Sequence, residues 1–237
     1  MVNISVIIPT LNEEGYIEKT LSALKPQLKK GDEIIVVDSY STDNTVKTAR
    51  KFGAKVIFIP RCGIGPAKTF GAKKAKNEII AMLDADGQPM PRWVNQIKSI
   101  FENSKIDAVD GLNYYEAPSL ARRYVYNIVE RIVFEIGRLN YRINHVFWMS
   151  INNCAIKKDI FLKQDGLRNV VCEDFDFANR TKGLIKGLYD PKLNVILSDR
   201  RFKKHGFLKT YLGWAKSDLS ILMKKNNTAA TDYEIVR

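Results

Sequence analysis

The chain has 237 residues, of which 45% are hydrophobic and 27% charged, and this composition excludes collagen, a disordered chain and a scaffold built from disulfides. Lys and Arg total 38 against 26 Asp and Glu, a net charge of +12, and the excess is concentrated in residues 200–225. A basic patch suits a phosphate-rich partner such as nucleic acid, an anionic membrane surface or a diphosphate, whereas a merely solvated basic face is the simpler alternative.

The sequence predicts neither a membrane-spanning helix nor a signal peptide. No apolar run approaches the ~18 residues that a membrane-spanning helix needs, and the first residues lack the charged start and apolar stretch of a signal peptide. We therefore expect a cytoplasmic protein. Cys62, Cys154 and Cys172 have no paired spacing, so reduced thiols are expected rather than bridges or a zinc site.

The first half of the chain alternates between two periodicities. Apolar runs typical of buried strands occupy residues 4–9, 33–38, 54–59 and 78–83. Helical patterns lie between them at 13–28 and 66–76. A third helix is predicted to begin after a cap at Asp43 or Asn44 and to end at residue 52. This alternation predicts a mainly parallel sheet with helices on both faces, and such sheets bind ligands beyond the carboxyl ends of their strands.

The second half is less regular. We expect a helix at 120–139 with arginines between its apolar positions, a strand at 150–156 and a helix at 173–186. A helix at 207–223 places Leu208, Tyr211, Leu212 and Leu219 on one apolar face, with Lys203, Lys204, Lys209, Lys216, Lys224 and Lys225 on or beside it and Trp214 available for an interface. That composition suits a helix lying on an anionic membrane, and the 119–139 stretch is a second candidate. Packing of either helix onto the domain explains the same pattern.

Carboxylates follow two of the predicted strands. Asp84 and Asp86 flank Ala85 after the fourth strand, and oxygen ligands of this kind suit Mg²⁺ or Mn²⁺, although Asp-Ala-Asp-Gly is also good turn chemistry. Asp38 ends the second strand, where it could accept hydrogen bonds from a base or ribose or simply precede a helix cap.

Three further segments carry candidate groups. Lys68 follows a glycine-rich stretch that matches neither a Rossmann fingerprint nor a P-loop, but near a helix start it could meet a diphosphate. Glu173 and Asp174 open an acidic helix start, where one could act as a general base or both could be solvated. His205 lies among basic residues, which favours it over His145 as a ligand.

Five segments together resemble the family 2 glycosyltransferases of the GT-A fold, over residues 3–202. They are Val6-Ile7-Ile8-Pro9-Thr10-Leu11-Asn12-Glu13-Glu14; Ile34-Ile35-Val36-Val37-Asp38-Ser39 with Ser41-Thr42-Asp43-Asn44-Thr45; Gly63 to Gly71 leading into Leu83-Asp84-Ala85-Asp86; Ile151-Asn152-Asn153-Cys154-Ala155-Ile156; and Glu173-Asp174-Phe175-Asp176. Each segment alone is a loose match, but their order at the strand ends is specific.

The resemblance implies a role for each matching position. Pro9, Thr10, Asn12, Glu13 and Asp38 would hold the nucleoside of a nucleotide-sugar donor. Asp84 and Ala85 would lie near the ribose or metal, Asp86 would bind Mn²⁺ or Mg²⁺, and Lys68 would contact the donor. Asp174, with Glu173 as second choice, would deprotonate the acceptor hydroxyl with inversion at the sugar. His205 would be a further metal ligand, and Arg200 and Arg201 would contact the diphosphate.

The resemblance also implies an organisation and partners. Residues 1–202 would form the catalytic domain, with a nucleotide-sugar-binding half at 1–111 and an acceptor-binding half at 112–202, and residues 203–237 a basic amphipathic extension. The donor would be a UDP- or GDP-sugar and the acceptor a glycan or lipid-linked molecule, with contact to an anionic membrane as a further option and no nucleic acid. The alternatives are a polyprenyl- or dolichol-phosphate sugar synthase, a non-catalytic sugar-nucleotide binder and a nucleic-acid-binding module.

Overall fold

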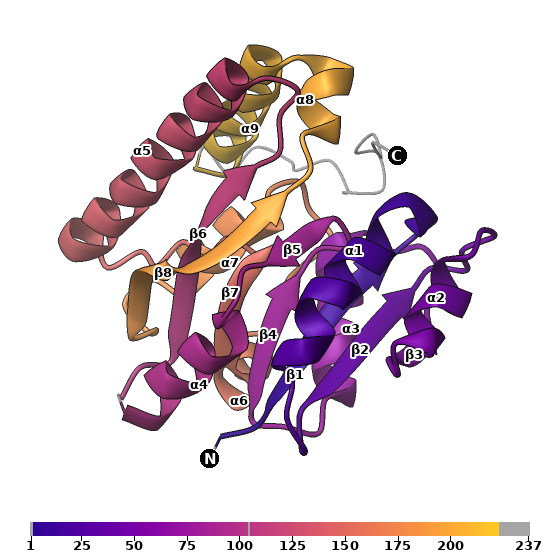
Figure 1. Ribbon diagram of the computed structural model, residues 1–237. Coiled ribbons are helices and arrows are strands. Elements are labelled where there is room, and N and C mark those ends of the chain that lie inside the picture. Colours follow the sequence, from indigo (N-terminus) through magenta and orange to yellow (C-terminus); the bar gives the residue numbers. More distant parts are fainter. Residues whose placement is uncertain (1, 104, 223–237) are drawn as a thin grey trace.

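The first half of the chain folds as the alternating pattern predicts (Figure 1). The computed structural model describes residues 2–103 and 105–222, with side chains as far as Ser217 at the C-terminal end. Its first strands and helices are β1 (Ile4–Thr10), α1 (Glu14–Leu24), β2 (Glu33–Asp38), α2 (Thr45–Lys51), β3 (Lys55–Phe58), α3 (Ile64–Lys74) and β4 (Ile79–Leu83). Helix α1 ends earlier than expected and gives way to a 3₁₀ turn, η1 (Lys25–Gln27), which contains Pro26, a residue without a backbone N–H.

The second half contains more elements than the sequence predicted. They are β5 (Gly87–Pro89), α4 (Trp93–Asn103), β6 (Ala108–Tyr115), α5 (Leu120–Asn144), β7 (Asn153–Lys157), α6 (Lys158–Lys163), α7 (Glu173–Arg180), β8 (Gly187–Leu197), α8 (Arg200–His205) and α9 (Phe207–Leu222). The predicted helix at 173–186 is wrong beyond Arg180, because the chain turns through Gly183, whose φ is +75°, and enters β8. Helix α5 continues to Asn144, past the predicted end at 139.

The strands form one mixed sheet in the order β3-β2-β1-β4-β7-β6-β8-β5. Strands β3, β2, β1 and β4 run parallel, and the register pairs Thr10 at the end of β1 with Asp38 at the end of β2. Strand β7 runs antiparallel to both β4 and β6. Because β1, β2 and β4 point the same way, the polar segments that follow them meet at one edge of the sheet.

Each face of the sheet is covered by helices. Successive side chains of a strand point to opposite faces, so Val6 belongs to the core layer that includes residues of α1, α4 and α8, whereas Ile7 belongs to the layer that includes residues of α3, α6 and α7. Trp93 of α4 and Phe161 of α6 are fully buried anchors of the two layers. Helix α5 contributes to both, through Tyr126 in one and Phe134 in the other.

The C-terminal helices close one layer with aromatic rings. Phe202 of α8 is buried, and the rings of Phe207, Tyr211 and Trp214 of α9 contact it. Trp214, which the sequence offers for an interface, is half-buried and packs against Phe202 and Tyr211. Leu219, Met223, Lys224 and Lys225 lie outside the side chains that the structure describes. In residues 2–103 and 105–222, no helix combines the length and apolar character needed to cross a bilayer.

Candidate active site

The loops after β1 and β2 are joined by the carboxylate of Asp38. Thr10 Oγ1 donates to Asp38 Oδ2 at 2.7 Å, and Ser41 donates its backbone N–H to Oδ1 at 2.8 Å and its hydroxyl to Oδ2 at 2.6 Å. Asp38 is fully buried, so these donors replace the water that the carboxylate loses. The two strand ends therefore form one rigid unit at the carboxyl edge of the sheet.

Asn12 and Glu13 extend this unit toward α1. Asn12 has a left-handed backbone with φ of 53°, a conformation that Asn tolerates better than most residues. Its N–H donates to Ser41 Oγ and its side-chain oxygen accepts from Thr42 N, both at 2.8 Å. The backbone N–H of Glu13 donates to Thr45 Oγ1 at 2.7 Å, and the carboxylate of Glu13 takes no part in this hydrogen bond.

The side chain of Glu13 pairs with Arg200, which comes from α8. Arg200 donates to both carboxylate oxygens of Glu13, at 2.6 and 3.1 Å, and its Nε lies 2.9 Å from Asp86 Oδ2. Its guanidinium lies over the ring of Tyr16, 4.7 Å from the centroid, and Ser198 Oγ donates to Asp86 Oδ2 at 2.8 Å. One arginine therefore bridges two carboxylates from different strand ends.

Burial and charge act against each other in this bridge. Burial raises the pKa of both Glu13 and Asp86 above their ordinary values, and Arg200 opposes the rise in each. The charge of Asp84 adds to the raised pKa of Asp86. Burial lowers the pKa of Arg200, but the hydrogen bond with Glu13 and the charge of Asp86 outweigh it and the net shift is upward. The site therefore concentrates negative charge that a cation neutralises.

The other carboxylate of the pair, Asp84, is bound by Lys68. Lys68 Nζ lies 2.5 Å from Asp84 Oδ1 and donates to the carbonyl of Ile151 at 2.6 Å. Lys68 has no exposed side-chain surface, whereas 30% of the Asp84 side chain is exposed. Between the two aspartates, the backbone carbonyl of Ala85 accepts a hydrogen bond from Thr20 Oγ1 at 2.7 Å, which fixes the turn. The side chain of Lys68, a residue of α3, is thus buried beneath the site and is not exposed on the surface of the protein.

Helix α7 brings its two first acids to the same edge. Trp148 Nε1 donates to Asp174 Oδ2 at 3.0 Å, and the N–H of Phe175 donates to Oδ1 at 2.9 Å. Burial raises the pKa of Asp174, and these hydrogen bonds and the charge of Lys68 oppose it. Burial, followed by the charge of Asp174, raises the pKa of Glu173 to about 7. Because Lys68 influences both acids, α7 and the end of β4 share one electrostatic site.

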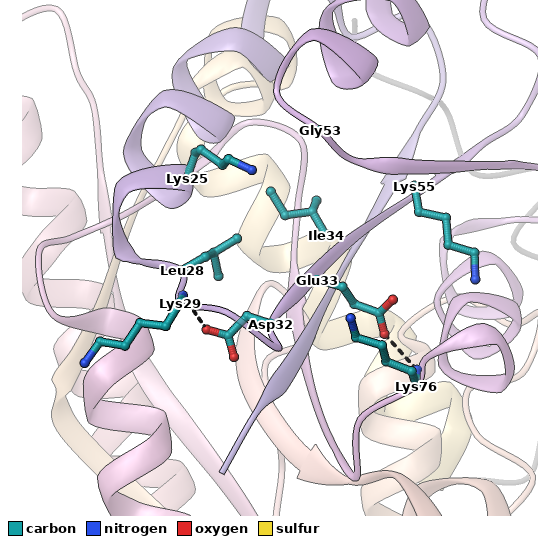
Figure 2. Close-up of a pocket in the computed structure, with 9 residues that line it drawn as sticks. All are labelled: Lys25, Leu28, Lys29, Asp32, Glu33, Ile34, Gly53, Lys55 and Lys76. Carbon is teal, nitrogen blue, oxygen red and sulfur yellow. Dashed lines mark hydrogen bonds between the residues drawn. The ribbon is translucent and has the colours of Figure 1, made fainter. Parts of the chain in front are cut away.

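A separate pocket opens at the opposite edge of the sheet (Figure 2). It lies where β2 and β3 begin and is lined by Lys25, Leu28, Lys29, Asp32, Glu33, Ile34, Gly53, Lys55 and Lys76. The two acids in it already accept hydrogen bonds from Lys29 N and Lys76 N, at 2.8 and 2.7 Å. Since ligands of parallel sheets bind at the carboxyl ends of the strands, this pocket is not the candidate active site.

The structure gathers most of the predicted site residues at the carboxyl edge. Glu13, Asp38, Asp84, Asp86 and Asp174 all lie there, with Pro9, Thr10, Asn12, Lys68, Ala85, Glu173 and Arg200 beside them. Arg201 follows Arg200 on α8 and is half-buried. Among the described residues, no three His, Cys, Asp or Glu side chains form a group that could hold a metal ion, so His205, at the end of α8, does not complete a set with the two aspartates.

Four side chains of the site were missed by the sequence reasoning. Trp148 and Ser198 lie in irregular segments and bind Asp174 and Asp86, and Tyr16 lies beneath Arg200. Asp110, on β6, is fully buried and accepts from Ser150 N and Oγ at 2.7 and 2.6 Å, and burial raises its pKa strongly. The sequence signal that could have found Asp110 is an acidic residue within an apolar strand. No such sequence signal marks Trp148 or Ser198.

Both the sequence and the fold are similar to those of known proteins. A family model, described as Glycosyl transferase family 2, matches residues 5–165. The chain is 38% identical over 104 aligned residues to an uncharacterized glycosyltransferase of Rickettsia bellii (strain RML369-C). The alignment covers 44% of this chain and 34% of that relative. The chain therefore spans about a third of the length of this curated relative.

Two solved structures share the fold at low sequence identity. The mannosyltransferase PcManGT from Pyrobaculum calidifontis, in complex with GDP-Man and Mn²⁺, superposes with a TM-score of 0.67 at 18% identity, over 95% of this chain and 65% of that chain. S. aureus TarS 1–349, in complex with UDP-GlcNAc, gives 0.65 at 21% identity over 83% and 58%. These likenesses confirm the predicted α/β GT-A fold with its C-terminal helical extension.

Proposed function

Because the chain belongs to glycosyl transferase family 2, we propose that it transfers a sugar from a nucleotide-diphosphate sugar to an acceptor hydroxyl or phosphate. The observation that carries the proposal is the approach of α7 to α3 and the end of β4: the side chain of Glu173 lies against Gly65, and Lys68, one turn further along α3, binds Asp84. These residues come from distant parts of the chain, and their charges act on one another at the carboxyl edge of the sheet. Donor and acceptor chemistry require such a shared site.

The donor side of the proposed site is the unit built on Asp38. Pro9, Thr10, Asn12, Glu13 and Asp38 are the proposed nucleoside contacts, with Lys68, Asp84, Ala85 and Asp86 toward the diphosphate and sugar. Asp38 already accepts three hydrogen bonds, so its contribution is mainly to hold the loops in the shape that receives the nucleoside. The neighbouring structures that contain UDP-GlcNAc and GDP-Man support a UDP- or GDP-sugar as the donor class.

We propose that Asp86, with Asp84, holds a divalent ion, Mn²⁺ or Mg²⁺. Their carboxylate oxygens are the hard ligands that these ions prefer, and the charge of Asp84 raises the pKa of Asp86, a conflict that a cation relieves. His205 is not part of the proposed set, because it forms no such group with the aspartates. A bound ion would neutralise charge on the diphosphate leaving group.

The chain's own residues supply the rest of the proposed chemistry. The carboxylate of Asp174 takes the proton of the acceptor hydroxyl while that oxygen attacks the anomeric carbon. The bond to the diphosphate oxygen breaks, and its electron pair leaves with the nucleoside diphosphate, so a single displacement inverts the configuration. Arg200 and Arg201 are the proposed cations for the departing diphosphate, and Glu173, whose pKa is about 7, is the second candidate for the base.

For the acceptor we propose a lipid-linked molecule or a glycan, met at the cytoplasmic face of a membrane. A polyprenyl- or dolichol-phosphate acceptor is the alternative within this reaction class. A nucleic-acid partner is disfavoured, because the carboxylates at the strand ends would repel phosphates that carry no metal ion. A non-catalytic sugar-nucleotide binder would keep the donor site without turnover.

Nucleotide release from a panel of UDP-, GDP- and dTDP-sugars with Mn²⁺ or Mg²⁺ tests the proposal. We expect slow release from one donor, abolished by EDTA and by Asp86→Ala, and reduced at least about a hundredfold by Asp174→Asn, the loss typical of a general base. Asp165→Asn is the matched control, because that side chain is 81% exposed on the surface.

Each other outcome has a defined meaning. A donor-induced, metal-dependent rise in melting temperature without release from any donor would favour the non-catalytic binder. Silence in both assays with every donor would overturn the nucleotide-sugar site. Loss of activity in Glu173→Gln but not in Asp174→Asn would move the base to Glu173.

A further inference from the structure

Helix α5 carries apolar side chains on two opposite faces. Tyr126, Phe134 and Gly137 are buried against the protein. A second set is 40–75% exposed and recurs every three or four residues along the whole helix: Leu120, Tyr124, Ile128, Ile132, Ile136, Leu139 and Ile143. We call these seven residues the α5 stripe. At 3.6 residues per turn, its centre lies roughly opposite the buried face. A helix on a globular protein normally has one apolar stripe, so this second stripe calls for a partner.

Helix α9 lies beside α5 and is anchored to it (Figure 1). Tyr211 of α9 donates a hydrogen bond to Glu130 of α5, and the rings of Phe207 and Tyr126 stack 4.6 Å apart. Leu208 and Leu212, which the sequence grouped with Tyr211, are instead 69% and 61% exposed. Among the described side chains, the exposed apolar surface of the two helices therefore consists mainly of the α5 stripe together with Leu208 and Leu212 of α9.

The charge around the stripe is positive. Five arginines lie on α5: Arg122, Arg123, Arg131, Arg138 and Arg142. Its two acids are already engaged, because Glu130 accepts from Tyr211 and Glu135 pairs with Arg131 and Arg138 at 3.0 and 2.8 Å. Lys209 and Lys216 of α9 are exposed as well. An apolar stripe with basic flanks matches a surface that combines hydrocarbon with negative charge.

A second copy of the chain fits this surface less well. Residues 131, 138 and 142 are separated by seven and four positions, so their side chains share one flank of the helix. In an antiparallel two-fold pair of α5 helices, the same flank of each copy would meet, so the net positive flank formed by Arg131, Glu135, Arg138 and Arg142 would face its own copy. Like charges opposed in this way weaken association.

We propose that the α5 stripe binds the surface of an anionic lipid bilayer, with α5 lying flat in the interface. The helix is roughly 37 Å long at 1.5 Å per residue, which allows many side chains to insert at once. Only the purpose of membrane binding rests on the proposed function: it would hold the proposed active site beside a membrane-borne acceptor. The binding itself is a separate property that can be measured without any substrate.

Flotation of the full chain with vesicles tests the proposal. We expect binding to vesicles of phosphatidylcholine with phosphatidylglycerol and little binding to phosphatidylcholine alone. The double variant Ile132→Ser/Ile136→Ser, altered at exposed positions, should lose roughly tenfold or more in binding because two apolar side chains no longer insert. Arg131→Gln/Arg142→Gln should weaken binding most at low salt. Phe58→Ser, at an exposed position on the edge strand β3, is the control and should bind as the wild type does.

The arms of the experiment separate the possible failures. Absence of flotation by the wild type at low salt, or equal flotation of the Ile132→Ser/Ile136→Ser variant, would overturn the membrane surface. A wild-type dimer in sedimentation that the same variant dissociates, without flotation, would assign the stripe to a second copy. Nucleotide release measured on the same proteins reports separately on the transferase: flotation without release would leave the surface standing and sink the proposed function.

Discussion

Trp148 favours the ionised form of Asp174, the form that the proposed base requires. Burial raises the pKa of this carboxyl, and the indole N–H, 3.0 Å from Oδ2, is the strongest of the interactions that oppose the rise. The pKa of the proposed base is thus a balance between desolvation, which raises it, and the hydrogen bonds and the charge of Lys68, which lower it. Removing the donor should change the pH at which the base works rather than the shape of the donor site.

Replacing Trp148 by Phe tests this balance. A hydrogen bond to a charged group contributes about 1.5–3 kcal/mol, and about 1.36 kcal/mol corresponds to one pKa unit. We therefore expect the pKa of Asp174 to rise further and the acidic limb of the transfer rate to move about one to two pH units higher. The measurement is the rate of transfer as a function of pH, with donor affinity followed in parallel.

Trp93→Phe is the matched control for that substitution. It also removes an indole hydrogen bond, 2.8 Å long, but to Asn153 in the core. The control should be less stable and should keep the wild-type acidic limb. An unmoved limb in Trp148→Phe, or a limb that moves equally in both variants, would contradict the role of Trp148.

Helices α5 and α9 are joined by a hydrogen bond from Tyr211 to Glu130, and burial disfavours the charged form of Glu130. Burial raises the pKa of Glu130 from 4.5 to about 7, although the hydrogen bond from Tyr211 opposes the rise. The folded chain therefore binds this proton more tightly than the unfolded chain. Stability from this group is complete below about pH 4.5 and is lost as the pH rises to about 7.

The variant Glu130→Gln removes this dependence, because the amide stays neutral and its oxygen can still accept from Tyr211. Relative to the wild type, its free energy of unfolding should gain up to about 3 kcal/mol between about pH 5 and about pH 8. Urea unfolding at the two pH values measures the difference. Glu135→Gln, which alters a half-exposed acid on the same helix, should follow the wild type; a parallel gain there would refute the assignment to Glu130.

Across the whole molecule, the aromatic layer under α8 connects the C-terminal helices to the donor site. Phe202 contacts Tyr115 and Tyr126 on one side and Phe207, Tyr211 and Trp214 on the other. Arg200, two residues earlier in the same short helix, reaches Glu13 and Asp86. We therefore expect the packing of the extension and the geometry of the proposed diphosphate site to be coupled through α8. The proposed boundary between residues 202 and 203 falls inside this helix.

Phe202→Ala should reveal the coupling. Loss of a buried phenylalanine costs roughly 3–5 kcal/mol of stability, and the freed α8 should also weaken donor binding because Arg200 is no longer held. Ile97→Ala, a fully buried residue of α4, is the control for lost packing and should keep the wild-type donor affinity. Donor affinity measured by calorimetry, well below both melting temperatures, compares them; equal affinities in the two variants would contradict the coupling.

The sequence alone determined the parallel half of the sheet and the carboxylates at its edge. Alternating periodicities located β1, β2, β3 and β4 within a few residues, and strands that run parallel bring Asp38, Asp84 and Asp86 to the same edge. The antiparallel half was harder, because β6 carries Asp110 and Asn113 within an apolar run and β8 contains Asp190 and Pro191. Asp110 and Asp190 accept hydrogen bonds from Ser150 and Gln96, tertiary partners that a local pattern does not reveal.

Only the tertiary structure decided which charged groups meet and which helix faces remain exposed. Arg200 bridges Glu13 and Asp86 over 187 and 114 positions of the chain, and Ser198 reaches Asp86 over 112. A helical pattern likewise predicts that α5 and α9 have apolar faces, but not that Tyr211 turns inward while Ile132 stays exposed. Periodicity reports the geometry of one element, whereas burial and pairing depend on the neighbours that folding brings to it.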